Sequence, residues 1–273
     1  DSLLRQREKY ENGLFTIRFN GEDFDQRGVN IYDLGNSLLA MQRIVHKAFL
    51  SRAGRLQKGA FPRTEERERL SLQLGERRRR SDAFALIPVL TDPIVQEYMK
   101  GVAQYVISGI VGYYTGNVLD RIHRENDQDK KIFIGSLYTE VANIVNRIDA
   151  SGSVESISLG SPVLEKETVA AFNSETKDYL QSIKDEYFLG DYLELKGHPY
   201  KLYPDSKIVA IKRPGGTTVS IFLNDRDFED IRYRRQPKAE YIFKGRPKYQ
   251  FGIETRAVPE FEADEIAYLE PER

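Results

Sequence analysis

One stretch of the chain concentrates the residue types that bind nucleic acids. Residues 231–251, IRYRRQPKAEYIFKGRPKYQF, hold seven Lys or Arg, five aromatic residues and one acid, although the whole chain has a formal net charge of −1. Lysine and arginine neutralise phosphates, and aromatic rings stack on the bases of single strands. The candidate contacts in this stretch are Arg234, Arg235, Lys244, Arg246, Lys248 and Tyr249.

An ordinary β-sheet explains the same pattern. Side chains alternate between the two faces of a strand, so Tyr241 and Phe243 would point into a core. The rings then left for stacking would be Tyr233, Tyr249 or Phe251. Four acids just upstream could neutralise the arginines within the chain: Asp225, Asp227, Glu229 and Asp230. The stretch would then be a face that docks a partner protein, and both interpretations stay open here.

A second basic cluster is the run ERRRR at residues 76–80, between the strand-like segments 69–75 and 81–90. At the tip of a hairpin its arginines would make a compact positive site, because clustered charge of one sign attracts phosphate or an acidic partner surface. These arginines are Arg77, Arg78, Arg79 and Arg80, helped by Arg67 and Arg69.

Residues that could catalyse a reaction form no recognised motif. The chain has no cysteine and three widely separated histidines, His46, His123 and His198. Nucleotide-binding glycine motifs and nucleophile motifs are absent. The acids Glu22, Asp23 and Asp25 could hold Mg²⁺ as in a nuclease, but acids also suit a turn that leads into a helix. An active site of Tyr, Lys or acids alone would leave no motif. We therefore expect a binding protein without metal or cofactor, with a metal-dependent nuclease as an alternative.

A long uncharged segment, residues 101–119, lies inside a predicted helix spanning residues 93–123. Asp92 is a good N-cap and Pro93 suits the first helical position. Ser108, Gly112 and Gly116 form a ridge of small residues that would let a second helix approach closely, within the chain or between two copies. The alternative is a membrane-perturbing effector that inserts this segment, which has just enough residues to span a bilayer.

The elements around these candidates predict an α+β fold. Residues 14–150 are expected to form an N-terminal domain in which a β-α-β-β layer, a sheet covered by one helix, leads into a helical middle. Residues 151–188 are expected as a linker and a helix. From residue 189 to 270, short alternating runs punctuated by GHP, RPGG and KGRP predict a small β-barrel, SH3-like or OB-like, without a long helix.

The segment LFTIRFNGEDFDQRGVNIYDLGNSLLAMQRIV resembles the opening of a group of poorly characterised bacterial proteins. In that group a strand ends in Phe-x-Gly and a helix opens on a D-L-x-x-S-L-x-x-x-x-R-I pattern, matched here by Phe19, Gly21, Asp33, Leu34, Ser37, Leu38, Arg43 and Ile44. Such proteins are often encoded beside anti-phage defence genes. The resemblance covers about the first third of the chain, implies an antiviral role and brings no catalytic residues with it.

The sequence thus predicts a non-catalytic adaptor or sensor subunit of a bacterial assembly, plausible in anti-phage defence. It would dock a partner protein or a nucleic acid, and it could form a homo-oligomer. We expect a cytoplasmic protein outside the membrane, because no hydrophobic leader is visible and the chain has no cysteine.

Overall fold

The computed structural model describes residues 13–21, 28–56, 59–77, 83–90, 92–150, 154–214, 216–234, 239–251 and 260–269. Its elements are β1 (Phe15–Asn20), α3 (Ile31–Arg52), α4 (Thr64–Leu70), β2 (Leu72–Arg77), β3 (Ala83–Pro88), α5 (Pro93–Gly109), η1 (Ile110–Tyr114), α6 (Val118–Arg124), α7 (Gln128–Val145), β4 (Ser156–Ser161), η2 (Pro162–Leu164), β5 (Lys166–Phe172), α8 (Ser174–Ser182), β6 (Tyr187–Leu189), β7 (Leu193–Tyr203), β8 (Ile208–Lys212), β9 (Thr218–Phe222), α9 (Asp225–Arg234), β10 (Glu240–Gln250) and β11 (Glu260–Leu269).

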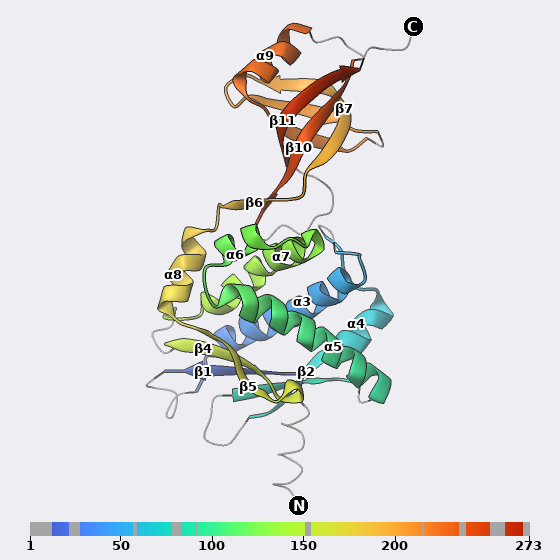
Figure 1. The fold of residues 1–273 in the computed structure, drawn as a ribbon. Coiled ribbons are helices and arrows are strands. Elements are labelled where there is room, and N and C mark those ends of the chain that lie inside the picture. The colour runs from blue at the N-terminus through green and yellow to red at the C-terminus, as the bar shows by residue number, and fades with distance from the viewer. Residues whose placement is uncertain are drawn as a thin grey trace, which may run out of the picture.

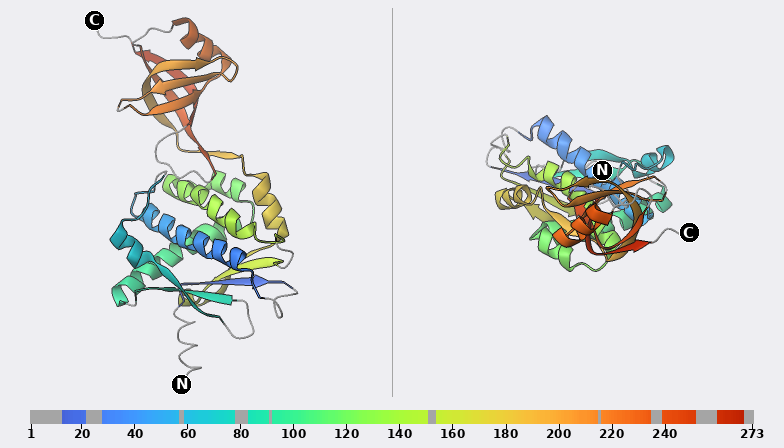
Figure 2. Two further views of the ribbon diagram at one scale, coloured as in Figure 1. Left: turned by 180° about the vertical axis from the view of Figure 1, so that it is seen from behind. Right: turned by 90° about the horizontal axis from the view of Figure 1, so that it is seen from above.

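The fold is mixed α and β, as the sequence predicts. Within the described ranges the buried apolar residues form two cores, one in an N-terminal unit (β1 to α8) and one in a C-terminal unit (β7 to β11). Figure 1 shows the C-terminal unit standing on the N-terminal unit, with the short strand β6 at the waist between them. The view from behind in Figure 2 shows that the N-terminal unit has two layers, with helices above and a sheet below.

An antiparallel sheet forms the floor of the N-terminal unit. Its strand order is β2-β3-β1-β4-β5, and Ile17 of the central strand lies opposite Phe84 on one side and Leu159 on the other. Residues 151–188, which we expected as a linker and a helix, supply β4 and β5 as well as α8. The predicted β-α-β-β layer is therefore part of a wider sheet.

The helices α3 and α7 form the centre of this unit. The side chain of Asn30 accepts a hydrogen bond from the backbone N–H of Tyr32 at 2.8 Å, so it caps the start of α3. Met41, Ile44 and Val45 on α3 are fully buried. Almost every residue of α7 between Lys131 and Val145 is buried or half-buried, which is expected of a helix surrounded by other elements.

The polar residues of the motif that carries the family resemblance lie between α3 and α7. A side-chain oxygen of Asp33 is 3.7 Å from the guanidinium of Arg147, and Arg43 is 3.7 Å from the buried carboxylate of Glu140. Ser37, between them on α3, has no exposed surface. Removing one partner of a buried ion pair leaves an uncompensated charge, so these residues hold the two helices in one arrangement.

The segment 93–123 is not the single helix that we expected. The Asp92 side chain caps α5 by accepting from the backbone N–H groups of Ile94 and Val95, as predicted. The helix then passes into the π-helical turn η1 and ends, and α6 begins after a break at Asn117, whose side chain accepts from the N–H of Asp120. Thr, Gly and Asn at residues 115–117 are poor helix formers, which explains the break. None of the helices in the described ranges is long and apolar enough to cross a membrane.

The ridge of small residues on this segment faces outward and not into a helix contact within the chain. Ser108 and Gly112 are exposed, and a Cβ added at Gly112 would meet no atom within 4 Å. The three atoms nearest to a Cβ at Gly116 would belong to the side chain of Arg121. The glycine that lets two helices approach is Gly109, where a Cβ would lie 2.9 Å from the Phe133 ring on α7. The expectation of close packing within the chain through Gly112 is therefore wrong.

The C-terminal unit consists of strands and the ten-residue helix α9. Its sheet has the order β11-β9-β8-β7-β10-β6, and β11 also pairs with β10. Neighbouring strands are antiparallel except β9 and β11, which run parallel. The long strand β7 pairs with β10 through residues 193–197 and with β8 through residues 198–203. Phe243, Phe261 and Ile221 have no exposed surface and fill the centre.

Glycines lie where two of these long strands come very close to a neighbour. A Cβ at Gly245 would be 2.0 Å from the carbonyl oxygen of Glu262, beside a register shift between β10 and β11. A Cβ at Gly197 would be 2.7 Å from the carbonyl oxygen of Lys212. Any larger residue at either position would collide with backbone, so both positions require glycine.

Aromatic side chains join the two units at the waist. Phe188 of β6 and Tyr249 and Phe251 at the end of β10 belong to the core of the N-terminal unit. The rings of Phe188 and Tyr249 stack with centroids 5.4 Å apart, and Phe251 lies 5.4 Å from Tyr138 of α7. A Cβ at Gly135 would be 2.5 Å from the Phe188 ring, so the glycine makes room for that ring against α7.

Candidate functional site

The basic run of β10 faces an acidic run on the neighbouring strand. The register between β10 and β11 places Lys244 opposite Glu265, Arg246 opposite Glu262, and Lys248 opposite Glu260. Opposite charges at such cross-strand positions stabilise a sheet by about 0.2–1 kcal/mol per pair. The concentration of positive charge that the sequence shows is therefore matched by acids on the following strand, β11.

The individual candidates in residues 231–251 do not form one free positive surface. Arg234 on α9 pairs with Asp230 at 2.8 Å, and Lys244 pairs with Glu194 at 3.2 Å. Arg246 is exposed, whereas Arg235 lies outside the described residues. Tyr249 is only 4% exposed and packs in the aromatic cluster of the waist, so the expectation that its ring is available for stacking is wrong.

The second basic cluster falls largely outside the described residues. Arg78, Arg79 and Arg80 lie there, and Arg77 is the last residue of β2. The acidic turn with Glu22, Asp23 and Asp25 also lies outside them. Among the described residues no group of His, Cys, Asp and Glu side chains could hold a metal ion.

A different surface of the C-terminal unit brings lysines and aromatic rings together, on the outward side of β7 and β8. We call it the lysine–tyrosine face, made of Tyr200, Lys201, Tyr203 and Lys212. The ammonium nitrogen of Lys201 lies 4.5 Å from the Tyr203 ring centroid, and that of Lys212 lies 5.4 Å from the Tyr200 ring centroid. Both rings are about two-fifths exposed, at 42% for Tyr200 and 40% for Tyr203.

Strand pairing extends this face onto β9. Lys212 lies opposite His198 of β7 and Thr218 of β9. Further along the same strands, Tyr203 lies opposite Ile208, which in turn lies opposite Phe222. Side chains at directly opposite positions point to the same side of a sheet, so Phe222 continues the row that begins with Tyr203.

The lysines of this face are available to a ligand. The ion pairs of the C-terminal unit that involve described residues use Lys207, Arg232, Arg234, Lys244 and Lys248. Lys201 and Lys212 thus have no carboxylate partner in the part of the chain that the structure describes. The nearby hydroxyl of Tyr203 raises the pKa of Lys201, so this side chain is positively charged at neutral pH.

Charge is separated between the two sides of the C-terminal unit. Residues 196–213 contain five cations and a single acid, Asp205. The strand β11 carries the acids Glu260, Glu262, Asp264 and Glu265 and no cation. An anionic ligand is therefore attracted to the β7–β8 side, although the unit as a whole is close to neutral.

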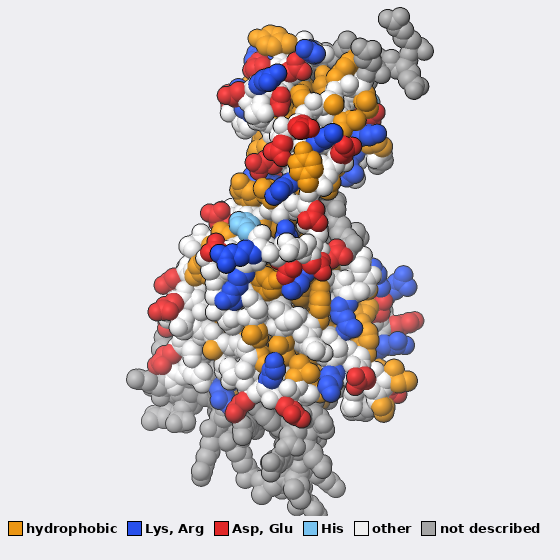
Figure 3. Space-filling model, viewed as in Figure 1, with side chains coloured by type: hydrophobic (Ala, Val, Ile, Leu, Met, Phe, Trp, Pro, Cys, Tyr) orange, Lys and Arg blue, Asp and Glu red, His pale blue; other side chains and the backbone are white. Residues whose placement is uncertain are grey.

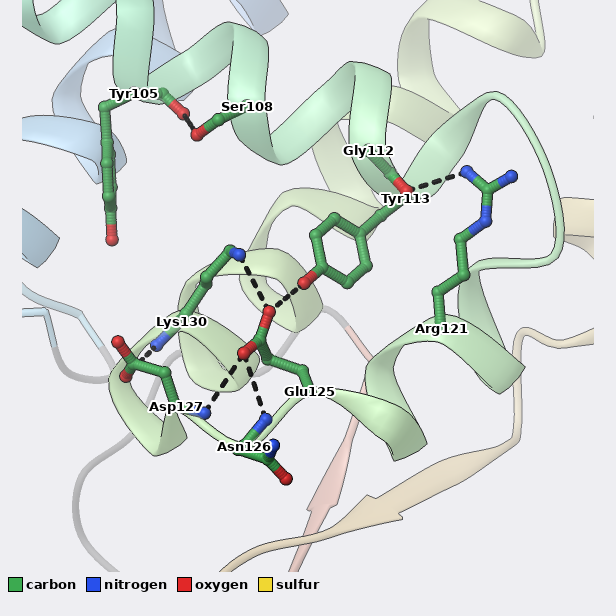
Figure 4. A network of polar contacts seen from close by, with 9 residues as sticks. All are labelled: Tyr105, Ser108, Gly112, Tyr113, Arg121, Glu125, Asn126, Asp127 and Lys130. Carbon is green, nitrogen blue, oxygen red and sulfur yellow. Dashed lines mark hydrogen bonds and ion pairs between the residues drawn. The ribbon is translucent and has the colours of Figure 1, made fainter.

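The polar network at the α6–α7 turn is the other candidate for chemistry (Figure 4). The carboxylate of Glu125 accepts hydrogen bonds from the hydroxyl of Tyr113 and from the backbone N–H groups of Asn126 and Asp127, the latter two at 3.0 and 3.2 Å. It also pairs with the ammonium of Lys130 at 2.8 Å.

The pKa shifts in this network are typical of a polar cluster that stabilises the fold, and we call it the clamp. Lys130, with help from Tyr113, lowers the pKa of the Glu125 carboxyl to about 2. Glu125 raises the pKa of Lys130, and burial together with Glu125 raises the pKa of Tyr113. A general acid or base works best with a pKa near the operating pH, whereas these three groups keep fixed protonation states at pH 7. The network fixes the turn below β6.

Sequence reasoning missed the residues of the lysine–tyrosine face, although a signal was present. The excess of five cations over one acid in residues 196–213 marks a basic segment. The aromatic and lysine residues of YKLY at positions 200–203 lie inside it. Side chains at every second position of a strand point to the same side, so Tyr249 lies on the same side of β10 as the core residue Tyr241. Extending this alternation along the whole strand identifies Tyr249 as a core residue.

Comparisons with protein-family models, with curated proteins and with solved structures found no match for this chain.

Proposed function

We propose that this protein is a non-catalytic binding subunit that holds single-stranded nucleic acid on an OB-like barrel in its C-terminal unit. The strand pairings support the barrel, because they run β7-β8-β9-β11-β10 and return to β7. Numbered within the unit this is the order 1-2-3-5-4-1. The third and fifth strands are parallel and a helix lies between the third and fourth. These features support an OB-fold, which is a five-stranded, partly open Greek-key barrel. An SH3-like barrel is the less fitting of the two predicted types.

The observation that carries this proposal is the position of the lysine–tyrosine face on the barrel. OB-folds bind oligonucleotides on the face made by their second and third strands, and on adjoining loops. These strands are β8 and β9 here, which carry Lys212 and Phe222, and the other residues of the lysine–tyrosine face lie beside them on the first strand, β7. Proteins that bind single strands combine a basic groove with aromatic rings for stacking. Lys201 and Lys212 supply the charge, and Tyr200, Tyr203 and Phe222 supply the rings.

Titrations with a labelled oligothymidylate at several salt concentrations test this function. Each phosphate contact contributes about 0.7 to the slope of log affinity against log salt. We expect Lys201→Ser and Lys212→Ser each to reduce the slope by about that amount, and Tyr203→Ala to weaken binding by about 1–3 kcal/mol because one stacked base is lost.

Lys244→Ser is the matched control, since it removes the same charge from the same unit but at a lysine held by Glu194. It should leave the affinity and the slope unchanged. Absence of salt-dependent binding to single-stranded DNA and RNA by the wild-type protein would refute the proposal. An equal loss in the Lys244 variant would show that binding is not directed to the lysine–tyrosine face.

We also propose that the N-terminal unit docks a partner protein, which makes the chain an adaptor. Large apolar side chains on its surface favour this role, among them Ile31 at 87%, Ile94 at 80% and Phe61 at 75% exposure. The resemblance of the first third of the chain supports a cytoplasmic bacterial assembly in anti-phage defence. Recovery of one partner by the wild type but not by Ile94→Asp would support the docking role, and equal recovery by both would contradict this placement.

A further inference from the structure

A second basic group lies next to β6, on the N-terminal unit. The helix α6 packs against β6, and its last turn carries Arg121, His123 and Arg124. The guanidinium of Arg121 is used within the unit, because it donates to the carbonyl oxygen of Gly112 at 2.7 Å. His123 and Arg124 are exposed, and neither forms an ion pair with any residue that the structure describes. Figure 3 shows His, Lys and Arg side chains together over α6, just below the waist.

Lys248 connects the barrel to this group. Its ammonium nitrogen lies 4.3 Å from the ring centroid of Phe222 on β9 and 4.0 Å from that of Tyr187 on β6. Phe222 ends the row of side chains that starts at Tyr203, and Tyr187 is 39% exposed. The outward surface of β9 is therefore continuous, through one lysine, with the strand against which α6 packs.

We propose that a bound single strand does not end on the barrel but continues over Phe222, Lys248 and Tyr187 to His123 and Arg124. This inference rests on the proposed function. The Lys248 ammonium lies over one face of the Phe222 ring and one face of the Tyr187 ring, so bases would contact the other sides of these rings while the backbone passes Lys248. The nearest acid, Glu260, is 3.8 Å from Lys248, at the outer limit of an ion pair, so phosphate can replace it.

The two units would then bind one strand together. The length of strand needed to contact both units can be measured. A single OB-fold occupies about 4–16 nucleotides depending on the protein. A strand of about 5 nucleotides can occupy the lysine–tyrosine face alone, whereas one of about 15 can also reach α6. Arg124 should therefore affect only the longer ligand.

The test compares labelled oligothymidylates of about 5 and about 15 nucleotides at about 50 mM salt, with the full chain and its Arg124→Ser variant. A lost contact with a slope of about 0.7 corresponds to about eightfold weaker binding at this salt concentration. We expect that loss for the longer strand and no change for the shorter one. Lys100→Ser, a charge-matched change at an exposed lysine of α5, is the control and should alter neither. Far-UV circular dichroism verifies that both variants fold.

The outcomes separate this inference from the function on which it rests. Binding of both oligonucleotides with equal affinity, unaffected by Arg124→Ser, would overturn the continuation to α6 but would not contradict a binding site on the barrel. Binding of neither strand would overturn both. A loss on the longer strand that is equal for Arg124→Ser and Lys100→Ser would show a general charge effect and would also overturn the inference.

Discussion

Replacing Gly109 by leucine should destabilise the N-terminal unit, whereas the same replacement at Gly112 should not. The two glycines are one turn apart on the same helical segment but have opposite surroundings. A Cβ at Gly109 would lie 2.9 Å from Phe133, 3.1 Å from Ile134 and 3.4 Å from Leu137, all on α7. A Cβ at Gly112 would meet nothing within 4 Å.

The size of the effect follows from what surrounds the new side chain. The Phe133 ring cannot move away easily, because it stacks on Tyr105 with centroids 4.5 Å apart. Overpacking a core costs about 1–3 kcal/mol, and a leucine recovers less than about 1 kcal/mol of helix propensity relative to glycine. A net loss of about 1–2 kcal/mol lowers the melting temperature by roughly 2–8 °C for a chain of this size.

Thermal unfolding followed by circular dichroism at 222 nm measures this difference, because most helices lie in the N-terminal unit. Gly112→Leu should stay within about 0.5 kcal/mol of the wild type, as substitutions on exposed surfaces do. Equal melting temperatures for the two variants would refute the argument. So would a larger loss at Gly112, which would mean that the outward ridge of Ser108, Gly112 and Gly116 is buried in solution, for example between two copies.

Three further predictions concern the clamp, the paired strands and the waist. Because the pKa of Glu125 is lowered from 4.5 to about 2, its carboxylate contributes stability above about pH 4.5 that is lost as the pH falls toward 2. In urea unfolding, Glu125→Gln should therefore lose less stability than the wild type over that pH interval, and parallel curves of stability against pH would contradict this. Arg246→Glu should cost about 0.2–1 kcal/mol through repulsion with Glu262, and adding Glu262→Arg should restore the loss, whereas additive losses would disprove the pairing. Gly135→Val should cost about 1–3 kcal/mol by displacing the Phe188 ring, and unchanged stability would show that this ring does not pack there.

Local patterns predicted the elements whose signals lie within one segment. The cap at Asp92 is encoded in neighbouring residues, and the structure confirms it. Alternation likewise placed Tyr241 and Phe243 in the core, where they are 1% and 0% exposed. Such signals depend on a single helix or strand and need no knowledge of its neighbours.

The rest depends on which segments meet, and alternation within a strand does not encode this. The acids that face Lys244, Arg246 and Lys248 belong to β11, so the charge of β10 could be interpreted only after the register was known. The addition of β4 to β1 joins segments far apart in the sequence. The lysine–tyrosine face likewise becomes visible only when β7 and β8 lie side by side.

The waist has a consequence for the order in which the protein is made. Phe188, Tyr249 and Phe251 belong to the core of the N-terminal unit, yet they are added long after its other residues. N-terminal domains usually fold first on the ribosome. The core of this unit, however, is complete only after residue 251 has been synthesised. By then four of the five strands β7 to β11 have been synthesised. The two units are therefore completed almost together, and a nascent chain that stalls before that point exposes the surface on α7 that these rings cover.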